Sequence, residues 1–198
     1  MSGTSVVGLV VGATLAAASA AGAATIAPMG VTTVEVTAPL GELGLGAAPT
    51  GTATVDASGP NPALAFPITG GTASVDGLTI LHDGSGVELF ALADATVSAT
   101  VGNFVIDTAA GTVAGDVNGA PGGVLFDFGA VTEAGIELTI ATLLSDSLTA
   151  VFGAPPLEGA TFGTATTEAA VVPIPAALPL LGAGLAILGM LARRRRPA

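Results

Sequence analysis

Hydrophobic and polar residues alternate along the middle of the chain, most cleanly in residues 96–101 and 136–140. In both stretches every second residue is apolar, which is the period at which side chains reach one face of a β-strand. Further short runs separated by turn residues are also expected to form strands: residues 31–37, 51–56, 72–81, 87–92, 104–107, 112–117, 124–128, 148–152 and 161–166. The pattern predicts an all-β fold, an antiparallel sandwich-like domain.

Helical periodicity is weak in this part of the chain. Only residues 133–148 leave room for one short helix, because no other stretch combines a 3.6-residue period with capping residues. Residues 39–62 are rich in Pro and Gly and are expected to be irregular, and residues 164–171 are expected to form a flexible linker.

The first residues have the features of a secretory signal peptide. An apolar run of small residues, 6–18, is followed by Ala21, Gly22 and Ala23, the small-residue pattern that signal peptidase requires beside the scissile bond. We therefore predict a signal peptide at residues 1–23 and a mature chain that begins at Ala24. No Lys or Arg precedes the apolar run, and the alternative is a buried N-terminal helix.

The last residues are apolar and then strongly basic. Residues 169–192 carry no charge, and residues 176–192 would be about 25 Å long as a helix. With flanking apolar residues this is enough to span a membrane. The positive-inside rule keeps the following cluster, Arg193, Arg194, Arg195 and Arg196, in the cytoplasm and places the preceding domain outside.

The same tail resembles the PEP-CTERM class of sorting signals, in its VPLPA variant. The motif is Val172, Pro173, Ile174, Pro175 and Ala176, followed by an apolar helix and the Arg cluster. The resemblance implies an exosortase-type sorting enzyme as a partner. It also implies a Gram-negative host, transient anchoring in the inner membrane and relocation to the cell surface or extracellular matrix. A simple C-terminal anchor without processing is the alternative.

These segments predict four parts: a signal peptide at 1–23, a β-rich extracellular domain at 24–163, a linker at 164–171 and a sorting signal at 172–198.

Composition supports a folded and acidic domain between the ends. The chain is 51% hydrophobic and 10% charged, whereas disordered chains have too little apolar surface to bury. The 15 acidic residues lie between Glu35 and Glu168, and the only four cations are the terminal arginines. Because such a domain repels phosphates, nucleic-acid binding is excluded. Cysteine is absent, so disulfides and thiolate metal sites are excluded too.

Candidate chemistry centres on His82, the only histidine, which is followed closely by Asp83 and Ser85. These are the residue types of a hydrolytic triad, but a triad is assembled in space and neighbours in sequence seldom form one. The simpler interpretation is a polar residue that opens a Gly-rich turn between two strands.

Acidic and amide side chains elsewhere in the chain suggest two other kinds of site, a calcium site and a glycosidase active site. Asp107, Asp116, Asn118 and Gly119 resemble fragments of a calcium loop without its full spacing. The carboxylates available for glycoside hydrolysis are Asp127, Glu133 and Glu137. The chain has neither Trp nor Tyr to line a sugar-binding cleft, and its seven Phe are expected in the core.

The domain also resembles HtaA-like haem-binding β domains. The similarity lies in residues 66–71, 82–84, 103–108 and 126–128. In that family haem capture relies on Tyr and His, and in this chain only His82 could serve, so no haem ligand is assigned.

We therefore expect no catalysis, no metal site and no resident cofactor. The expected role is that of a structural or interaction protein of the cell surface, extracellular matrix or biofilm, with extracellular polysaccharide as one candidate partner. The alternatives are an extracellular module that binds haem or calcium and, less favoured, a secreted hydrolase.

Overall fold

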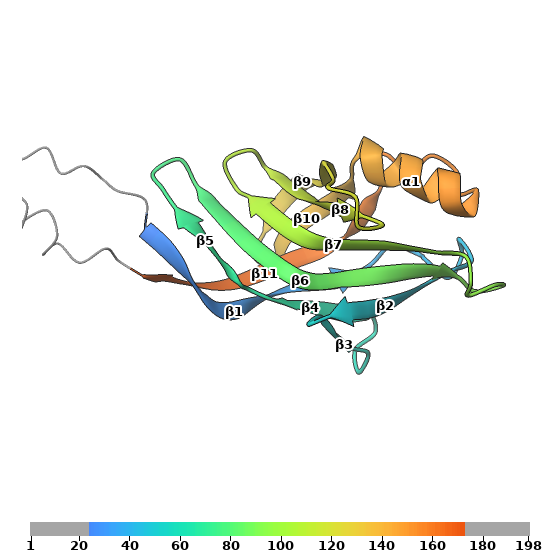
Figure 1. Cartoon of the computed structure of the whole chain (residues 1–198), viewed down its shortest axis with the longest axis horizontal. Helices are drawn as coiled ribbons and strands as arrows, with labels where there is room; N and C mark the ends of the chain where they lie inside the picture. Colours follow the sequence, from blue (N-terminus) through green and yellow to red (C-terminus); the bar gives the residue numbers. More distant parts are fainter. Residues whose placement is uncertain (1–23, 173–198) are drawn as a thin grey trace, which may run out of the picture.

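The computed structural model describes residues 24–172, and these form eleven antiparallel strands and one helix (Figure 1). The all-β prediction is confirmed for this part of the chain. In chain order the elements are β1 (Ala24–Val36), β2 (Leu45–Gly51), β3 (Thr54–Asp56), β4 (Ala63–Pro67), β5 (Gly70–Ala73), β6 (Leu78–Ala91), β7 (Ser98–Asp107), β8 (Thr112–Val117), β9 (Val124–Thr132), β10 (Gly135–Ile140), α1 (Thr142–Phe152) and β11 (Thr161–Val172).

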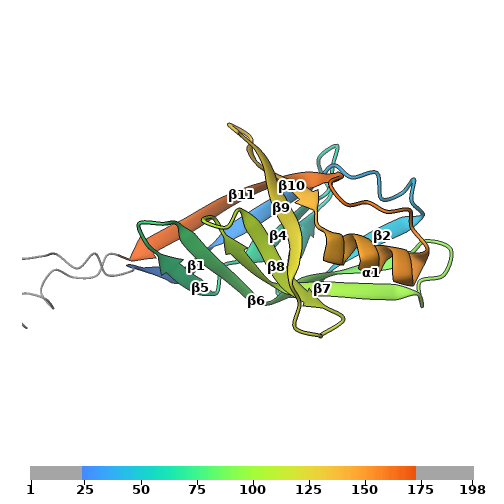
Figure 2. The ribbon, with the colours of Figure 1, turned by 90° about the horizontal axis from the view of Figure 1, so that it is seen from above.

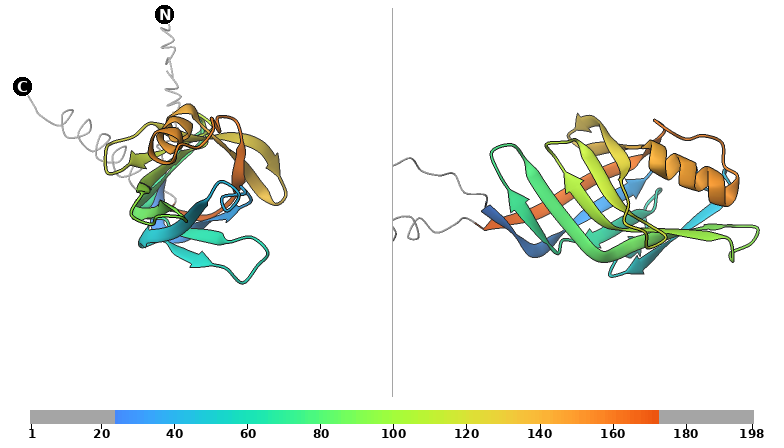
Figure 3. Two further views of the ribbon diagram at one scale, coloured as in Figure 1. Left: turned by 90° about the vertical axis from the view of Figure 1, so that its right-hand side faces the viewer. Right: turned by 45° about the horizontal axis from the view of Figure 1, so that its top comes forward.

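The strands belong to one hydrogen-bonded sheet that closes on itself. Along the sheet β1 is followed by β5, β6, β7, β8, β9, β10 and β11, and β11 pairs again with β1. The view along the molecule shows the strands wrapped around a common interior (Figure 3). The prediction of a sandwich-like domain with two sheets was therefore wrong. The domain has a single sheet, because the first and last strands pair and leave no break between two layers.

Three short strands extend this closed sheet. β4 pairs with the second half of β1, β3 pairs with β4, and β2 pairs with the second half of β6. Residues 39–62, expected to be irregular apart from a strand at 51–56, contain β2 and β3. The predicted strand overlaps β3, whereas β2 begins earlier, at Leu45, and β4 was not predicted at all. Their short runs of small residues carry little periodicity, so pairing with longer strands decides their conformation.

Irregular pairing lets the long strands curve around the interior. The register shifts in β6 between His82 and Gly86 and in β7 between Gly102 and Val105, which are neighbouring places on the sheet. Gly86 allows the backbones to approach closely here, because a Cβ atom at this position would lie 2.4 Å from the Val101 carbonyl oxygen. Bulges and glycines of this kind bend a sheet sharply, which is what closure requires.

The interior is apolar because inward positions of the strands alternate with outward ones. Of the seven Phe, three are buried and the others are partly buried. The side chains with the least exposure are Ile26, Ile80, Leu125 and His82. His82 is therefore the one ionisable side chain among the most deeply buried residues.

The helix α1 covers the sheet at the end far from the chain termini, where it contacts β7 and β9 (Figure 2). Leu144, Ser145 and Leu148 form its buried face at the i, i+1 and i+4 positions. The helix ends at Gly153, which has a left-handed conformation and donates its N–H to the Thr149 carbonyl. The strand predicted at residues 148–152 was wrong, since these residues form the second half of α1.

The last strand extends through the segment expected to be a linker. Residues 164–171 pair with β1 throughout most of their length, so the predicted boundary at 163 was wrong and the folded domain continues to Val172. These residues are small and polar, and they form a strand because β1 offers them an edge. No helix within residues 24–172 has the length and apolarity needed to cross a membrane.

Candidate functional site

His82 lies inside the closed sheet, on the long strand β6. Its side chain is only 1% exposed, and the strand continues past it with a bulge before Gly86. The prediction of a surface turn between two strands was wrong, because the Gly-rich residues after His82 form a bulge within one strand. Because ionisable side chains are mostly exposed, the burial of His82 makes it the first residue to consider as a functional group in the described domain.

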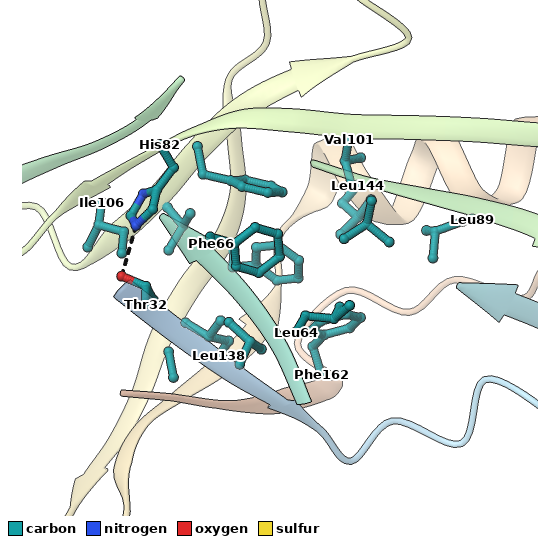
Figure 4. Close-up of a pocket in the computed structure, with 16 residues that line it drawn as sticks. Thr32, Leu64, Phe66, His82, Leu89, Val101, Ile106, Leu138, Leu144 and Phe162 are labelled. Carbon is teal, nitrogen blue, oxygen red and sulfur yellow. Dashed lines mark hydrogen bonds between the residues drawn. The ribbon is translucent and has the colours of Figure 1, made fainter. Parts of the chain in front are cut away.

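Two threonines connect His82 to the surface. The imidazole Nε2 and the Thr32 Oγ1 atom share a hydrogen bond of 2.8 Å (Figure 4). Thr32 Oγ1 bonds in turn to Thr167 Oγ1 at 3.0 Å. Thr32 is buried, whereas Thr167 is exposed. Sequence analysis did not identify Thr32, although it shares the inward period of Val34 and Val36 in β1 and is the polar exception on that face.

Burial keeps the imidazole neutral. The pKa of His82 lies below its usual value mainly because burial disfavours the charged ring, while the Phe104 backbone and the Asp83 carboxylate act weakly in the opposite direction. The Phe104 backbone does not reach hydrogen-bonding geometry, so Nδ1 has no partner. A neutral ring with its proton on Nε2 leaves only a lone pair unsatisfied.

Beside His82 lies a small apolar cavity of about 50 Å³ (Figure 4). Phe66 and Phe104 stack edge to face at 5.1 Å between their ring centres on one side of it, and Leu144 of α1 closes another side. An apolar cavity of about 150 Å³ is needed to hold a molecule as small as benzene. The interior therefore does not fit a haem, and Nε2 of His82 is already bonded to Thr32.

The hydrolytic triad is not assembled around His82. Ser85 is buried and its Oγ donates a hydrogen bond of 2.9 Å to the backbone carbonyl of His82, not to the imidazole. The hydroxyl thus stabilises the bulge of β6 and has no base beside it. This geometry gives no support to the hydrolase alternative.

A Gly-rich surface hollow of about 300 Å³ brings together residues 84–86 and the Asp116 region. Asn103 connects them, because its side chain accepts a hydrogen bond from the Gly84 N–H at 2.8 Å and donates one to Asp116 Oδ2 at 2.7 Å. Asp107 lies elsewhere, at the β7–β8 turn, where it accepts hydrogen bonds from Ala109 and Ala110. Asp107 is therefore not brought to Asp116, as the calcium-loop alternative would require, and the described residues include no group of three acidic or His side chains suited to a metal ion.

The three carboxylates considered for glycoside hydrolysis also have different neighbours in the described domain. Glu137 accepts hydrogen bonds from the Thr161 hydroxyl and the Ala130 N–H. Asp127 lies on β9 opposite Thr139, and Glu133 is exposed in the turn between β9 and β10. No hydrogen bond between described residues joins any two of them, so they form no visible acid–base pair.

The residues predicted for export and sorting lie at or beyond the two ends of the domain. Ala24 begins β1 and Val172 ends β11, and these ends are neighbours because Thr25 pairs with Val172 (Figure 1). The remaining predicted sites lie outside the described residues: Ala21, Ala23, Pro173, Ile174, Pro175, Ala176, Arg193, Arg194, Arg195 and Arg196. The predicted signal peptide and membrane-spanning helix lie outside them as well.

Comparison of the chain with protein-family models, curated proteins and solved structures finds no match.

Proposed function

We propose that this is an exported protein of the cell surface or extracellular matrix, processed through its C-terminal sorting signal, with a domain that acts by structure or interaction and not by catalysis. The observation that carries the proposal is the pairing of Thr25 with Val172. It brings the start of β1, which directly follows the predicted signal peptide, and Val172, the first residue of the predicted sorting motif, to one end of the domain.

This arrangement suits a protein attached to a membrane at both ends during export. Two membrane-directed segments that leave the same end of a domain can both enter one bilayer without distorting the domain. The opposite end, with α1, then points away from the membrane and is free to meet partners (Figure 2). The absence of Lys and Arg between residues 24 and 172 keeps the domain from adhering to anionic lipid surfaces.

The interior supports a non-catalytic role. His82 is buried and bonded to Thr32, and Ser85 is committed to a backbone carbonyl. The Glu137 carboxylate is occupied by a hydroxyl and an N–H group. His82, Ser85 and Glu137 thus each have a structural task, which favours an interaction role over acid–base or nucleophilic chemistry at these three residues.

The test is to express the full chain with a C-terminal epitope tag in a Gram-negative host that carries an exosortase-type enzyme. The expected mature product begins at Ala24 by intact mass and lacks the tag. The double variant P173A/P175A should retain the tag and accumulate in the membrane, since prolines keep the motif extended for recognition. The matched control P197A, beyond the arginines, should be processed like the parent.

Two results would contradict the proposal. If P173A/P175A were released with the same products as the parent, the tail would not be a sorting signal and only its prediction as a membrane anchor would remain. A surface protein that retains residues 1–23 would remove the signal-peptide prediction.

A further inference from the structure

The end of β11 is held on one side only. β10 pairs with β11 as far as Ala165, and beyond it residues 166–172 have β1 as their single partner among the described strands. Val171 and Val172 are 46% and 48% exposed, so about half of their surface faces solvent while they remain on β1. The final residues of the domain are therefore a weakly anchored strand segment.

A bulge separates this end from the rest of the β1–β11 ladder. Regular pairing runs from Val36 with Gly163 to Gly30 with Ala169, and the register then shifts before Ile26 pairs with Val171. Gly30 makes the shift possible, because it has a φ of 103° and a Cβ atom there would lie 1.9 Å from the Glu168 carbonyl oxygen. The pairs Ile26–Val171 and Thr25–Val172 can thus open without disturbing the ladder behind the bulge.

β1 does not depend on these two pairs for its position. On its other side Ala24 and Thr25 pair with Ala73 and Thr72 of β5. When Val171 and Val172 leave, Thr25 stays paired with β5, and the β1–β11 pairs behind the bulge keep the sheet closed. Opening is therefore a local event of β11.

An enzyme that cuts the chain next to Val172 must enclose an extended backbone, and strands paired in a sheet do not offer both edges. Resting on the proposed function, we infer that the pairs Ile26–Val171 and Thr25–Val172 form a gate for C-terminal processing. The sorting enzyme takes β11 only after these pairs open, while the rest of the domain stays folded. The rate of processing is then set partly by this opening.

Paired cysteines test the gate cleanly, because the natural chain has no Cys. Residues directly opposite in an antiparallel pair have the Cα separation that a disulfide needs. The tagged full chain carrying T25C/V172C is expressed with the exosortase-type enzyme, in a host that forms periplasmic disulfides and in one that does not. The control pair T33C/T166C locks the same two strands behind the bulge.

We expect the oxidised T25C/V172C chain to lose its tag at least about tenfold more slowly than its reduced form, since the disulfide prevents the local opening that the two terminal pairs otherwise permit. The reduced form should match V172C alone, and oxidised T33C/T166C should match the parent. Equal rates for the oxidised and reduced forms would overturn the gate and leave the proposed function intact. Slowing by both disulfides would overturn it too, because processing would then need wider opening. A parent chain that keeps its tag would instead refute the proposed function.

Val172 is part of the predicted motif, so V172C alone could block recognition by the sorting enzyme. In that case a second variant that leaves the motif unchanged tests the gate. T25G weakens the gate strand by the amount that glycine usually costs, so processing should be about two- to fivefold faster than in the parent. T72G changes the neighbouring residue of β5, which has no pair with β11, and should leave the rate unchanged. An unchanged rate for T25G would overturn the proposal.

Discussion

The two ends of the domain are built differently. At the end covered by α1, Leu144 and Leu148 are 2% and 3% exposed and pack into the core. At the end where the chain enters and leaves, Met29, Val171 and Val172 are between 46% and 62% exposed on a paired ribbon of β1 and β11. The same kind of apolar residue is buried at one end and presented to solvent at the other.

The two ends therefore serve different purposes: the α1 end stabilises the fold, and the β1–β11 end keeps the end of the last strand accessible. Burying an aliphatic side chain contributes about 1.5–3 kcal/mol, so the α1 end stabilises the closed sheet. On the ribbon, Val171 and Val172 of β11 stay about half exposed while Ile26 of β1 is buried, and the tip of β11 can therefore open while Ile26 stays in the core. A segment that must be recognised in an extended form is suited to the second environment.

The strongest test of the comparison truncates one aliphatic side chain at each end. Leu144→Ala should lower the free energy of unfolding by about 2–5 kcal/mol, because it removes buried methyl groups and enlarges the cavity beside Phe66. Val171→Ala should change it by less than about 0.5 kcal/mol, since the side chain is half exposed. Urea denaturation measures both values, and similar losses would show that the ends are equivalent.

A smaller effect is expected from the polar contact that holds α1 in place. The buried Ser145 Oγ accepts a hydrogen bond of 2.9 Å from the Leu157 N–H. Ser145→Ala leaves that donor unsatisfied and should cost about 1–3 kcal/mol. Ser147→Ala is the control and should be nearly neutral in the same denaturation experiment, because its half-buried hydroxyl donates only to the Leu143 carbonyl of its own helix and its loss leaves no donor unsatisfied. Equal effects would mean that solvent replaces the bond and that α1 is less securely packed than its burial indicates.

The smallest effect is the contribution of His82, in the core beside β1, to the pH dependence of the free energy of unfolding. Because the pKa of folded His82 is lowered by burial, the unfolded chain binds more protons below about pH 6.5. The free energy of unfolding should therefore fall with decreasing pH from there, with a slope of up to about 1.4 kcal/mol per pH unit. His82→Gln should flatten the curve between about pH 6.5 and pH 5, above the range in which ordinary carboxylates titrate. The same slope in both proteins would assign the pH dependence to other groups.

Strands with clear alternation could be predicted from the sequence, and those shaped by distant partners could not. β8 was predicted with its observed bounds, Thr112–Val117, and β10 almost so, because inward and outward residues alternate in both. Residues 148–152 have high β propensity, yet they continue a helix whose buried face begins at Leu144 and which Gly153 ends. Residues 164–171 looked like a linker because their partner strand lies at the other end of the sequence.

The candidate site was less accessible to sequence reasoning. His82 was identified as the residue to examine, but its neighbours Asp83 and Gly84 indicated a surface turn. Its burial results from the bulge in β6 and from Thr32, which lies 50 residues away in the chain. No local pattern shows that these two side chains meet.

The pairing of the first strand with the last also decides when this domain can finish folding. Thr32 and Thr167 are 135 positions apart, and their strands form the junction that closes the sheet. Contacts so distant in sequence must overcome a large loop-closure entropy, and folds dominated by such contacts form slowly. Under the proposed export, β1 would wait with one edge unpaired until β11 has crossed the membrane. The proposal thus implies that translocation ends before closure of the sheet begins, and that the chain passes through the export channel with its final pairing still to be made.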